Sequence, residues 1–200
     1  MPEHKGKKGN WDGNFGIRYT LRNKLIPERL VPFYRRVLQN LEVKRILEVG
    51  CNRGHNLEAI SYCGQYELYG IDINSYSIIL ARENKETNFA IGNIFDILYK
   101  DNYFDLLLTA GVLIHLNPED LLKALKEIFR VTKKYYLMLE YNEDYKEFKQ
   151  IPYRNNVGLW KGNFKKLILD NFNVKLVQKG ETGPEEGFGD KRGYFLFEKV

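Results

Sequence analysis

Cysteine and histidine are scarce in this 200-residue sequence, which has two cysteines, Cys51 and Cys63, and three histidines. Their spacing matches no metal-binding motif, and two isolated thiols form no disulfide framework, so we expect neither a zinc site nor a disulfide scaffold. No apolar run approaches the roughly 20 residues that cross a bilayer, and residues 1–10 lack the apolar core of a signal peptide. We therefore expect a cytoplasmic protein with no membrane partner and with both thiols reduced and packed.

Acidic residues are in the minority, since 31 Lys and Arg against 26 Asp and Glu give a net charge of +5. The basic excess is scattered, and its densest cluster, Lys5 to Lys8, is more typical of a solvated tail than of a nucleic-acid-binding surface. The hydrophobic fraction of 44% suits one well-buried core. Since the sequence shows no repeat and no domain boundary, it predicts a single domain over residues 1–200. The modest, scattered charge disfavours nucleic acid as a partner class compared with a small molecule.

An acid ends each of two apolar strands that flank a glycine-bearing turn: residues 45–54 read RILEVGCNRG, and residues 68–73 read LYGIDI. This layout is typical of a nucleoside-binding crevice, where the acid of the second strand grips a ribose. A dinucleotide fold needs three glycines, G-x-G-x-x-G, to close on a pyrophosphate, and only Gly50 and Gly54 are present. The turn therefore favours a ligand with a ribose, an adenine and an amino-acid tail but no phosphate, namely S-adenosylmethionine.

Four segments in order resemble the motifs of the class I S-adenosylmethionine-dependent methyltransferases. They are EVGCNRG at 48–54, GIDIN at 70–74, GNIFD at 92–96 and YFDLLLTAGVLIHL at 103–116. The resemblance implies an α/β, Rossmann-like fold with a doubly wound seven-stranded sheet, mostly parallel with one antiparallel edge strand. It also implies an enzyme with S-adenosyl-L-methionine as its cofactor.

Hydrophobic periodicity predicts strands that alternate with helices, as right-handed crossovers in a parallel sheet require. The last two strands follow each other without a helix, so they should pair as an antiparallel ribbon at one sheet edge. Ser75 and Asn117 are the expected caps of their helices, and residues 180–192 are expected to form a flexible turn. The predicted strands cover residues 45–49, 67–73, 88–91, 104–109, 135–140, 174–178 and 194–198, and the predicted helices cover 25–41, 56–63, 75–84, 118–131 and 163–171.

Roles at the expected cofactor site follow from chemistry. Glu48 can orient the ammonium of the cofactor, and Asp72 can accept both ribose hydroxyls or, alternatively, cap the helix that begins near Ser75. Asn93 stands where the family usually has an acid near the adenine amino group, and its amide oxygen can accept the same hydrogen bond. The predicted cofactor-binding residues of this core are Glu48, Gly50, Cys51, Asn52, Gly54, Asp72, Ile73, Asn93, Ile94, Ala110 and Gly111.

His115 is the candidate catalytic residue, because an imidazole near its ordinary pKa can take a proton from a hydroxyl nucleophile. The alternative is that His115 only lines the crevice. Methyl transfer needs little acid-base help, since the sulfonium is already an activated leaving group and in-line positioning supplies much of the acceleration.

Two segments outside the common core are rich in aromatic residues and arginine. They are residues 10–23, which can fold over the carboxyl edge of the sheet as a lid, and residues 141–164, which open onto the same edge. The division implied is a lid and helix over 1–43, a cofactor-binding core over 44–140, a substrate-side segment over 141–163, and a C-terminal helix and antiparallel strands over 164–200.

These segments carry a narrower resemblance. The pattern W-x-G-x-F-G-x-x-Y-x-x-R-N at 11–23, with P-Y-R at 152–154 and L-W-K-x-x-F at 159–164, is similar to methylases associated with pseudaminic acid biosynthesis. The similarity implies that Tyr19, Arg22 and Asn23 close over the methionine end of the cofactor. It also implies substrate-binding roles for Trp11, Phe15, Tyr141, Tyr153, Arg154 and Lys161, of which Tyr153, Arg154 and Lys161 would meet a carboxylate or nucleotide phosphate.

Two departures and one alternative bear on the acceptor. Asn155 replaces the family's usual small or glycine residue, and Gly162 with Asn163 replace its usual charged pair, so these departures leave open an acceptor different from that of the family. Trp11, Phe15 and Trp160 could instead pack the lid onto the body. The favoured function is direct in-line methylation of a sugar or nucleotide-sugar of surface-glycan biosynthesis. The alternatives are an RNA or protein methyltransferase and a non-catalytic cofactor-binding partner.

Overall fold

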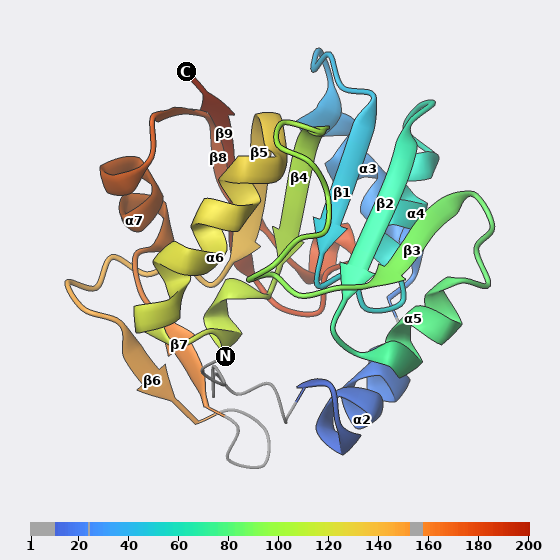
Figure 1. Cartoon of the computed structure of the whole chain (residues 1–200), viewed down its shortest axis with the longest axis horizontal. Helices are drawn as coiled ribbons and strands as arrows, with labels where there is room; N and C mark the ends of the chain where they lie inside the picture. Colours follow the sequence, from blue (N-terminus) through green and yellow to red (C-terminus); the bar gives the residue numbers. More distant parts are fainter. Residues whose placement is uncertain (1–10, 24, 153–157) are drawn as a thin grey trace.

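The computed structural model describes residues 11–23, 25–152 and 158–200. Seven strands form one sheet in the order β3-β2-β1-β4-β5-β9-β8, with helices on both of its faces (Figure 1). These strands are β1 (Arg45–Val49), β2 (Glu67–Asp72), β3 (Thr87–Ile91), β4 (Phe104–Ala110), β5 (Thr132–Glu140), β8 (Val174–Thr182) and β9 (Arg192–Lys199). A separate antiparallel pair joins β6 (Lys149–Ile151) to β7 (Leu159–Lys161).

The sheet has a hydrophobic core on each face. One core packs α3 (Pro27–Leu38), α4 (His55–Ser61) and α5 (Ser75–Ala81) against the strands, and the other packs α6 (Pro118–Val131) and α7 (Phe164–Asn171). The remaining helices are α2 (Asn14–Arg22) and the short 3₁₀ turns η1 (Leu113–His115) and η2 (Pro184–Glu186). Strands covered on both faces must be apolar throughout, which explains the continuous runs of β1 and β4.

Strands β1 to β5 are mutually parallel, and β9 runs antiparallel between β5 and the edge strand β8. This is the predicted class I methyltransferase fold. Because β1 lies between β2 and β4, the order of the strands reverses there, and ligands of doubly wound sheets bind beside such a switch point at the carboxyl ends of the strands.

Two local predictions were wrong, and a third was right in position only. Asn74, not Ser75, caps α5, because its Oδ1 accepts hydrogen bonds from the amides of Tyr76 at 3.0 Å and Ser77 at 3.2 Å. Asn117 occupies the predicted N-cap position of α6, although its side chain makes no cap bond. The expected flexible turn over 180–192 has defined structure instead, since β8 runs to Thr182, η2 follows, and Phe188 is buried at 2% exposure.

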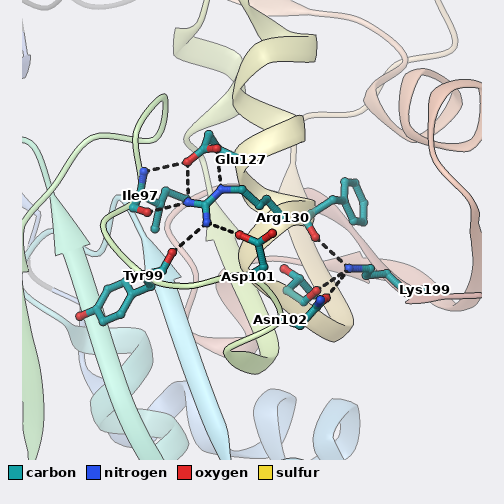
Figure 2. Close-up of polar contacts among 9 residues, drawn as sticks. Ile97, Tyr99, Asp101, Asn102, Glu127, Arg130 and Lys199 are labelled. Carbon is teal, nitrogen blue, oxygen red and sulfur yellow. Dashed lines mark hydrogen bonds and ion pairs between the residues drawn. The ribbon is translucent and has the colours of Figure 1, made fainter.

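The connection between β3 and β4 is tied to α6 by one arginine (Figure 2). The Arg130 guanidinium donates to the carbonyl oxygens of Ile97 at 2.7 Å and Tyr99 at 2.9 Å. It also pairs with Asp101 at 2.7 Å and with Glu127 at 2.8 Å. Glu127 in turn accepts the amide of Ile97 at 3.0 Å, so both backbone N–H and backbone carbonyl groups of the connection are bonded to α6.

Within the described ranges, no helix has the length and apolarity needed to cross a membrane. Nor do the described residues bring three histidine, cysteine or acidic side chains together as a metal site would require. Cys51 is buried, Cys63 is half-buried, and both are free thiols.

Candidate functional site

A cavity of about 960 Å³ opens at the carboxyl edge of the sheet. Thirteen of the fourteen predicted cofactor-binding residues line it. They come from the C-terminal part of α2 and its cap, from the carboxyl ends of β1, β2 and β4, and from the segments that follow β1, β2, β3 and β4: Tyr19, Arg22, Asn23, Glu48, Gly50, Cys51, Asn52, Asp72, Ile73, Asn93, Ile94, Ala110 and Gly111. Gly54 is the exception. It begins α4 in the left-handed region with φ of 78°, and a Cβ there would collide with the ring of Phe89.

The glycine turn after β1 brings two loops into contact. Gly50 has φ of 74°, and a Cβ on it would lie 2.5 Å from a methyl group of Val112, which follows β4. The amides of Gly50 and Cys51 both donate to the carbonyl of Ile71, at 2.8 and 3.0 Å. A side chain at position 50 would therefore strain the backbone and separate the two loops.

Asp72 is fixed between the turns that follow β1 and β2. Its Oδ2 accepts the amide of Asn52 at 2.8 Å, and its Oδ1 accepts the amide of Asn74 at 2.8 Å. Because Asn74 caps α5, the alternative role of Asp72 as that helix cap is excluded. Burial raises the pKa of Asp72, and each carboxylate oxygen keeps a lone pair that can accept a hydroxyl.

Glu48 is buried at 1% exposure on the cavity wall. Its Oε1 accepts the side-chain amide of Asn56 at 2.6 Å, and burial raises its pKa to about 8. Three buried oxygens here have no hydrogen-bond partner among the described residues: Glu48 Oε2, Asn52 Oδ1 and Asn56 Oδ1. Buried polar atoms are normally paired, so three acceptors on one wall suit a ligand rich in donors, such as an ammonium and ribose hydroxyls.

The expected adenine side is lined by Asn93 and Ile94. Asn93 Oδ1 already accepts the amide of Phe95 at 3.0 Å, so the amide oxygen keeps one lone pair for a ligand. The loop continues into the connection that Arg130 anchors.

The N-terminal helix α2 and the residues beside it cover the cavity. Asn74 donates to the carbonyl of Trp11 at 2.6 Å, and the hydroxyls of Thr20 and Ser77 are 2.7 Å apart. The Trp11 ring lines the cavity, whereas Phe15 is buried against it with ring centroids 5.0 Å apart and does not line the cavity.

His115 lies in η1 with its ring centroid 4.5 Å from that of Trp11. Burial lowers its pKa to about 4, so the imidazole is neutral throughout the physiological range and is a weak base. The lowered pKa and the ring contact with Trp11 together favour the crevice-lining role over proton abstraction.

The structure does not bring Tyr141 or Lys161, two further predicted substrate residues, to the cavity wall. Lys161 pairs with Glu143 at 3.0 Å, and the hydroxyl of Tyr141 donates to Asp190 at 2.8 Å. Tyr153 and Arg154 lie outside the described residues.

Sequence reasoning missed two parts of the site. Glu140, at the end of β5, is fully buried, and its Oε1 accepts the amides of Val112 at 2.9 Å and Leu113 at 3.0 Å. Burial raises its pKa to about 7. The position of Glu140 at the end of an apolar run is a sequence pattern that could have identified it. No local pattern marked the second part, Phe188 to Arg192, of which Phe188, Gly189, Asp190 and Arg192 line the cavity.

Comparison with known proteins bears on the chemistry of this cavity. Residues 47–135 match a family model described as a methyltransferase domain. The O-methyltransferase rstn1 of Aspergillus nomiae is 29% identical over 113 residues, which cover 53% of this chain and 49% of that protein. The chain spans about half or less of the length of the curated relatives that it matches.

Two solved structures share the fold over nearly the whole chain. The 1,6-didemethyltoxoflavin N1-methyltransferase of Burkholderia thailandensis, with bound 1,6-didemethyltoxoflavin and S-adenosylhomocysteine, has a TM-score of 0.73 at 12% identity and covers 97% of this chain and 87% of its own. The magnesium protoporphyrin IX methyltransferase of Synechocystis, with bound S-adenosylhomocysteine, has a TM-score of 0.69 at 13% identity and covers 97% and 98%.

Proposed function

We propose that this chain, which carries a class I S-adenosylmethionine-dependent methyltransferase domain with S-adenosylmethionine as cofactor, methylates a small molecule that is a sugar or nucleotide-sugar of surface-glycan biosynthesis. The observation that carries the methyltransferase chemistry is the wall of buried acceptors beside Asp72 and Glu48. The sugar acceptor is supported by the resemblance of residues 11–23 and 152–164 to methylases of pseudaminic acid biosynthesis.

The cavity size supports a small acceptor. Sites for small ligands typically enclose about 300–1,000 Å³, and a cavity of about 960 Å³ is large enough for the cofactor and a compact second molecule. A macromolecular acceptor would need an open groove leading to the reacting centre. We further propose that residues 1–43 act as lid and helix, 44–140 bind the cofactor, 141–163 lie on the substrate side and 164–200 complete the sheet.

The residues present fit the cofactor. Asp72 would hold the ribose, Glu48 the ammonium, and Asn93 with Ile94 the adenine, while Tyr19, Arg22 and Asn23 would lie over the methionine end. When bound, the sulfonium supplies a methyl group on an activated leaving group. The chain itself positions the reactants and excludes water, because Trp11 and α2 cover the cavity mouth and Glu140 fixes the loop that carries Val112.

Calorimetry with S-adenosylhomocysteine tests the cofactor role of Asp72. We expect Asp72→Asn to weaken binding by about tenfold or more, since it removes a charge-assisted acceptor. Asp105→Asn is the matched control, because Asp105 also accepts two backbone amides, those of Lys44 and Arg45 at 2.9 Å each, at the opposite end of the sheet. Equal affinity in both variants, or no binding by the wild type, would contradict the proposal.

The acceptor class is tested with isotopically labelled S-adenosylmethionine and extract of the source cells. Mass spectrometry should find the label in a sugar or nucleotide-sugar. Label in RNA or protein would instead support the corresponding alternative.

A further inference from the structure

Arg192 lines the cavity on the side away from the expected ribose site. It is the first residue of β9, and because β9 is antiparallel to β5, it lies at the same edge as the carboxyl ends of the parallel strands. Four strand spacings separate β2, which ends in Asp72, from β9, and at about 4.8 Å each they amount to about 19 Å. The predicted cofactor residues of the core follow β1, β2, β3 and β4, so Arg192 faces the opposite part of the cavity.

The guanidinium of Arg192 is held in place by its neighbours. Its Cζ lies 5.6 Å from the ring centroid of Phe188 and 5.7 Å from that of Tyr141. Its Nε is 3.4 Å from the carbonyl oxygen of Asp190, and the Tyr141 hydroxyl donates to the Asp190 carboxylate. An arginine packed against two aromatic rings is pre-organised, so little side-chain entropy remains to be lost when it binds a ligand.

The same guanidinium reaches the cavity floor. Gly111 has φ of 68°, and a Cβ built on it would have Arg192 Nη1 3.6 Å away. The cation therefore lies beside the residues that follow β4, on the side toward β5 and β9.

Arg192 forms no ion pair with a carboxylate in the part of the chain that the structure describes. Two acids near it make their hydrogen bonds to other groups: Asp190 accepts the hydroxyl of Tyr141, and Glu140, on which the charge of Arg192 acts without a hydrogen bond, accepts two backbone amides. Four of the five N–H donors of the guanidinium thus have no hydrogen-bond acceptor among the described residues. Such a fork suits the paired oxygens of a carboxylate or phosphate.

We propose that Arg192 binds an anionic group, a carboxylate or a phosphate, on the methyl acceptor and so determines which acceptors are used. The inference rests on the proposed methyltransferase function and adds a charge requirement to it. It also assigns acceptor recognition to the C-terminal strands, outside the methyltransferase domain match at 47–135.

The first experiment separates acceptor binding from cofactor binding. Calorimetry with S-adenosylhomocysteine is carried out on the wild type, Arg192→Gln and the control Arg35→Gln, whose side chain is exposed on α3. Because Arg192 approaches the predicted cofactor residues only at Gly111 and lies about four strand spacings from Asp72, we expect all three dissociation constants to agree within about threefold. A loss of about tenfold or more in Arg192→Gln alone would assign Arg192 to the cofactor and overturn the proposal.

The second experiment measures label transfer from S-adenosylmethionine to the small-molecule fraction of the extract. We expect the product to be retained on an anion exchanger, and transfer by Arg192→Gln to fall about tenfold or more in dilute extract, with Arg192→Lys falling less and Arg35→Gln unchanged. More concentrated extract should recover much of the loss, as a KM effect does. Phosphatase treatment of the extract distinguishes the sources, because it abolishes transfer only if the anion is a phosphate.

A neutral or cationic product, or full transfer by Arg192→Gln in dilute extract, would overturn the proposal and leave the methyltransferase function standing. No transfer by the wild type would overturn the proposed function, and this inference with it. The two failures are therefore distinguishable.

Discussion

Three acids end buried strands in this fold, and their partners give them different roles. Asp72 accepts amides from two loops, Glu48 accepts one side-chain amide, and Glu140 holds the loop after β4. The sequence pattern is the same in each case, an acid after an apolar run. The motifs of the resemblance include Asp72 and Glu48 but not Glu140, and the sequence pattern alone does not show that Glu140 holds a loop 27 residues away.

At this scale His115 yields a test of its role. We expect His115→Phe to retain at least about a tenth of the wild-type kcat at pH 7, since the ring contact with Trp11 remains and general-base help is typically worth about 10²–10⁴. His115→Ala should lose more, because it removes that contact. Label-transfer rates with S-adenosylmethionine measure both variants. A fall of about a hundredfold or more in a folded His115→Phe would identify a catalytic base instead.

At the scale of elements, strongly periodic segments were predicted well. The predicted bounds 118–131 of α6 are confirmed, because its apolar residues recur on one face and Pro118 stands at the first position. The bounds of β5 were missed by three residues, since Thr132–Lys134 are polar and basic rather than apolar. The helix α2 was missed altogether. It depends on tertiary contacts with α5, such as that between Thr20 and Ser77, and contact over such a separation is not visible as a period.

The Arg130 cluster of Figure 2 leads to a stability prediction for one connection. Arg130→Gln should lower the free energy of unfolding by about 1–3 kcal/mol, because it removes charge-assisted bonds to the carbonyls of Ile97 and Tyr99 and to Glu127 and Asp101. Lys126→Gln, on an exposed position of the same helix, is the control and should change little. Urea unfolding measures both, and equal midpoints would contradict the anchoring role.

At the scale of the whole molecule, the fold was predictable and the cavity only in part. Alternating strands and helices determine a doubly wound sheet, so the carboxyl edge and its cofactor side could be inferred from residues 45–116. The other wall depends on β9 returning beside β5, which brings Arg192 next to Gly111 across 81 positions of sequence. No periodicity or motif records a contact at that separation.

The buried acids also predict how stability depends on pH. The folded-state pKa is raised from 4.5 to about 8 for Glu48 and to about 7 for Glu140, so the folded state binds protons more tightly than the unfolded state. The free energy of unfolding should therefore fall as pH rises from about 4.5 to about 8 for Glu48 and from about 4.5 to about 7 for Glu140, by up to about 1.4 kcal/mol per pH unit for each group. His115 has a lowered pKa and acts oppositely, but only below about pH 6.5.

Thermal unfolding between pH 6.5 and 8 measures this dependence. Glu48→Gln should flatten the decline, whereas Glu147→Gln, an exposed control, should leave it as in the wild type. A decline that is equally steep in Glu48→Gln would show that Glu48 ionises without penalty in the folded protein.

The antiparallel return of β9 has a consequence for the order in which the protein is made. Gly111 and Arg192 face each other in the cavity, yet a ribosome that adds roughly 5–20 residues per second reaches Arg192 about 4–16 s after Gly111. The interval is longer still for α3, which is synthesised before β1: its residue Phe33 contacts the ring of Phe188, which is added near the end of the chain. The nascent chain thus contains every predicted cofactor-binding residue, up to Gly111, before the cavity wall formed by Phe188 to Arg192 has been translated.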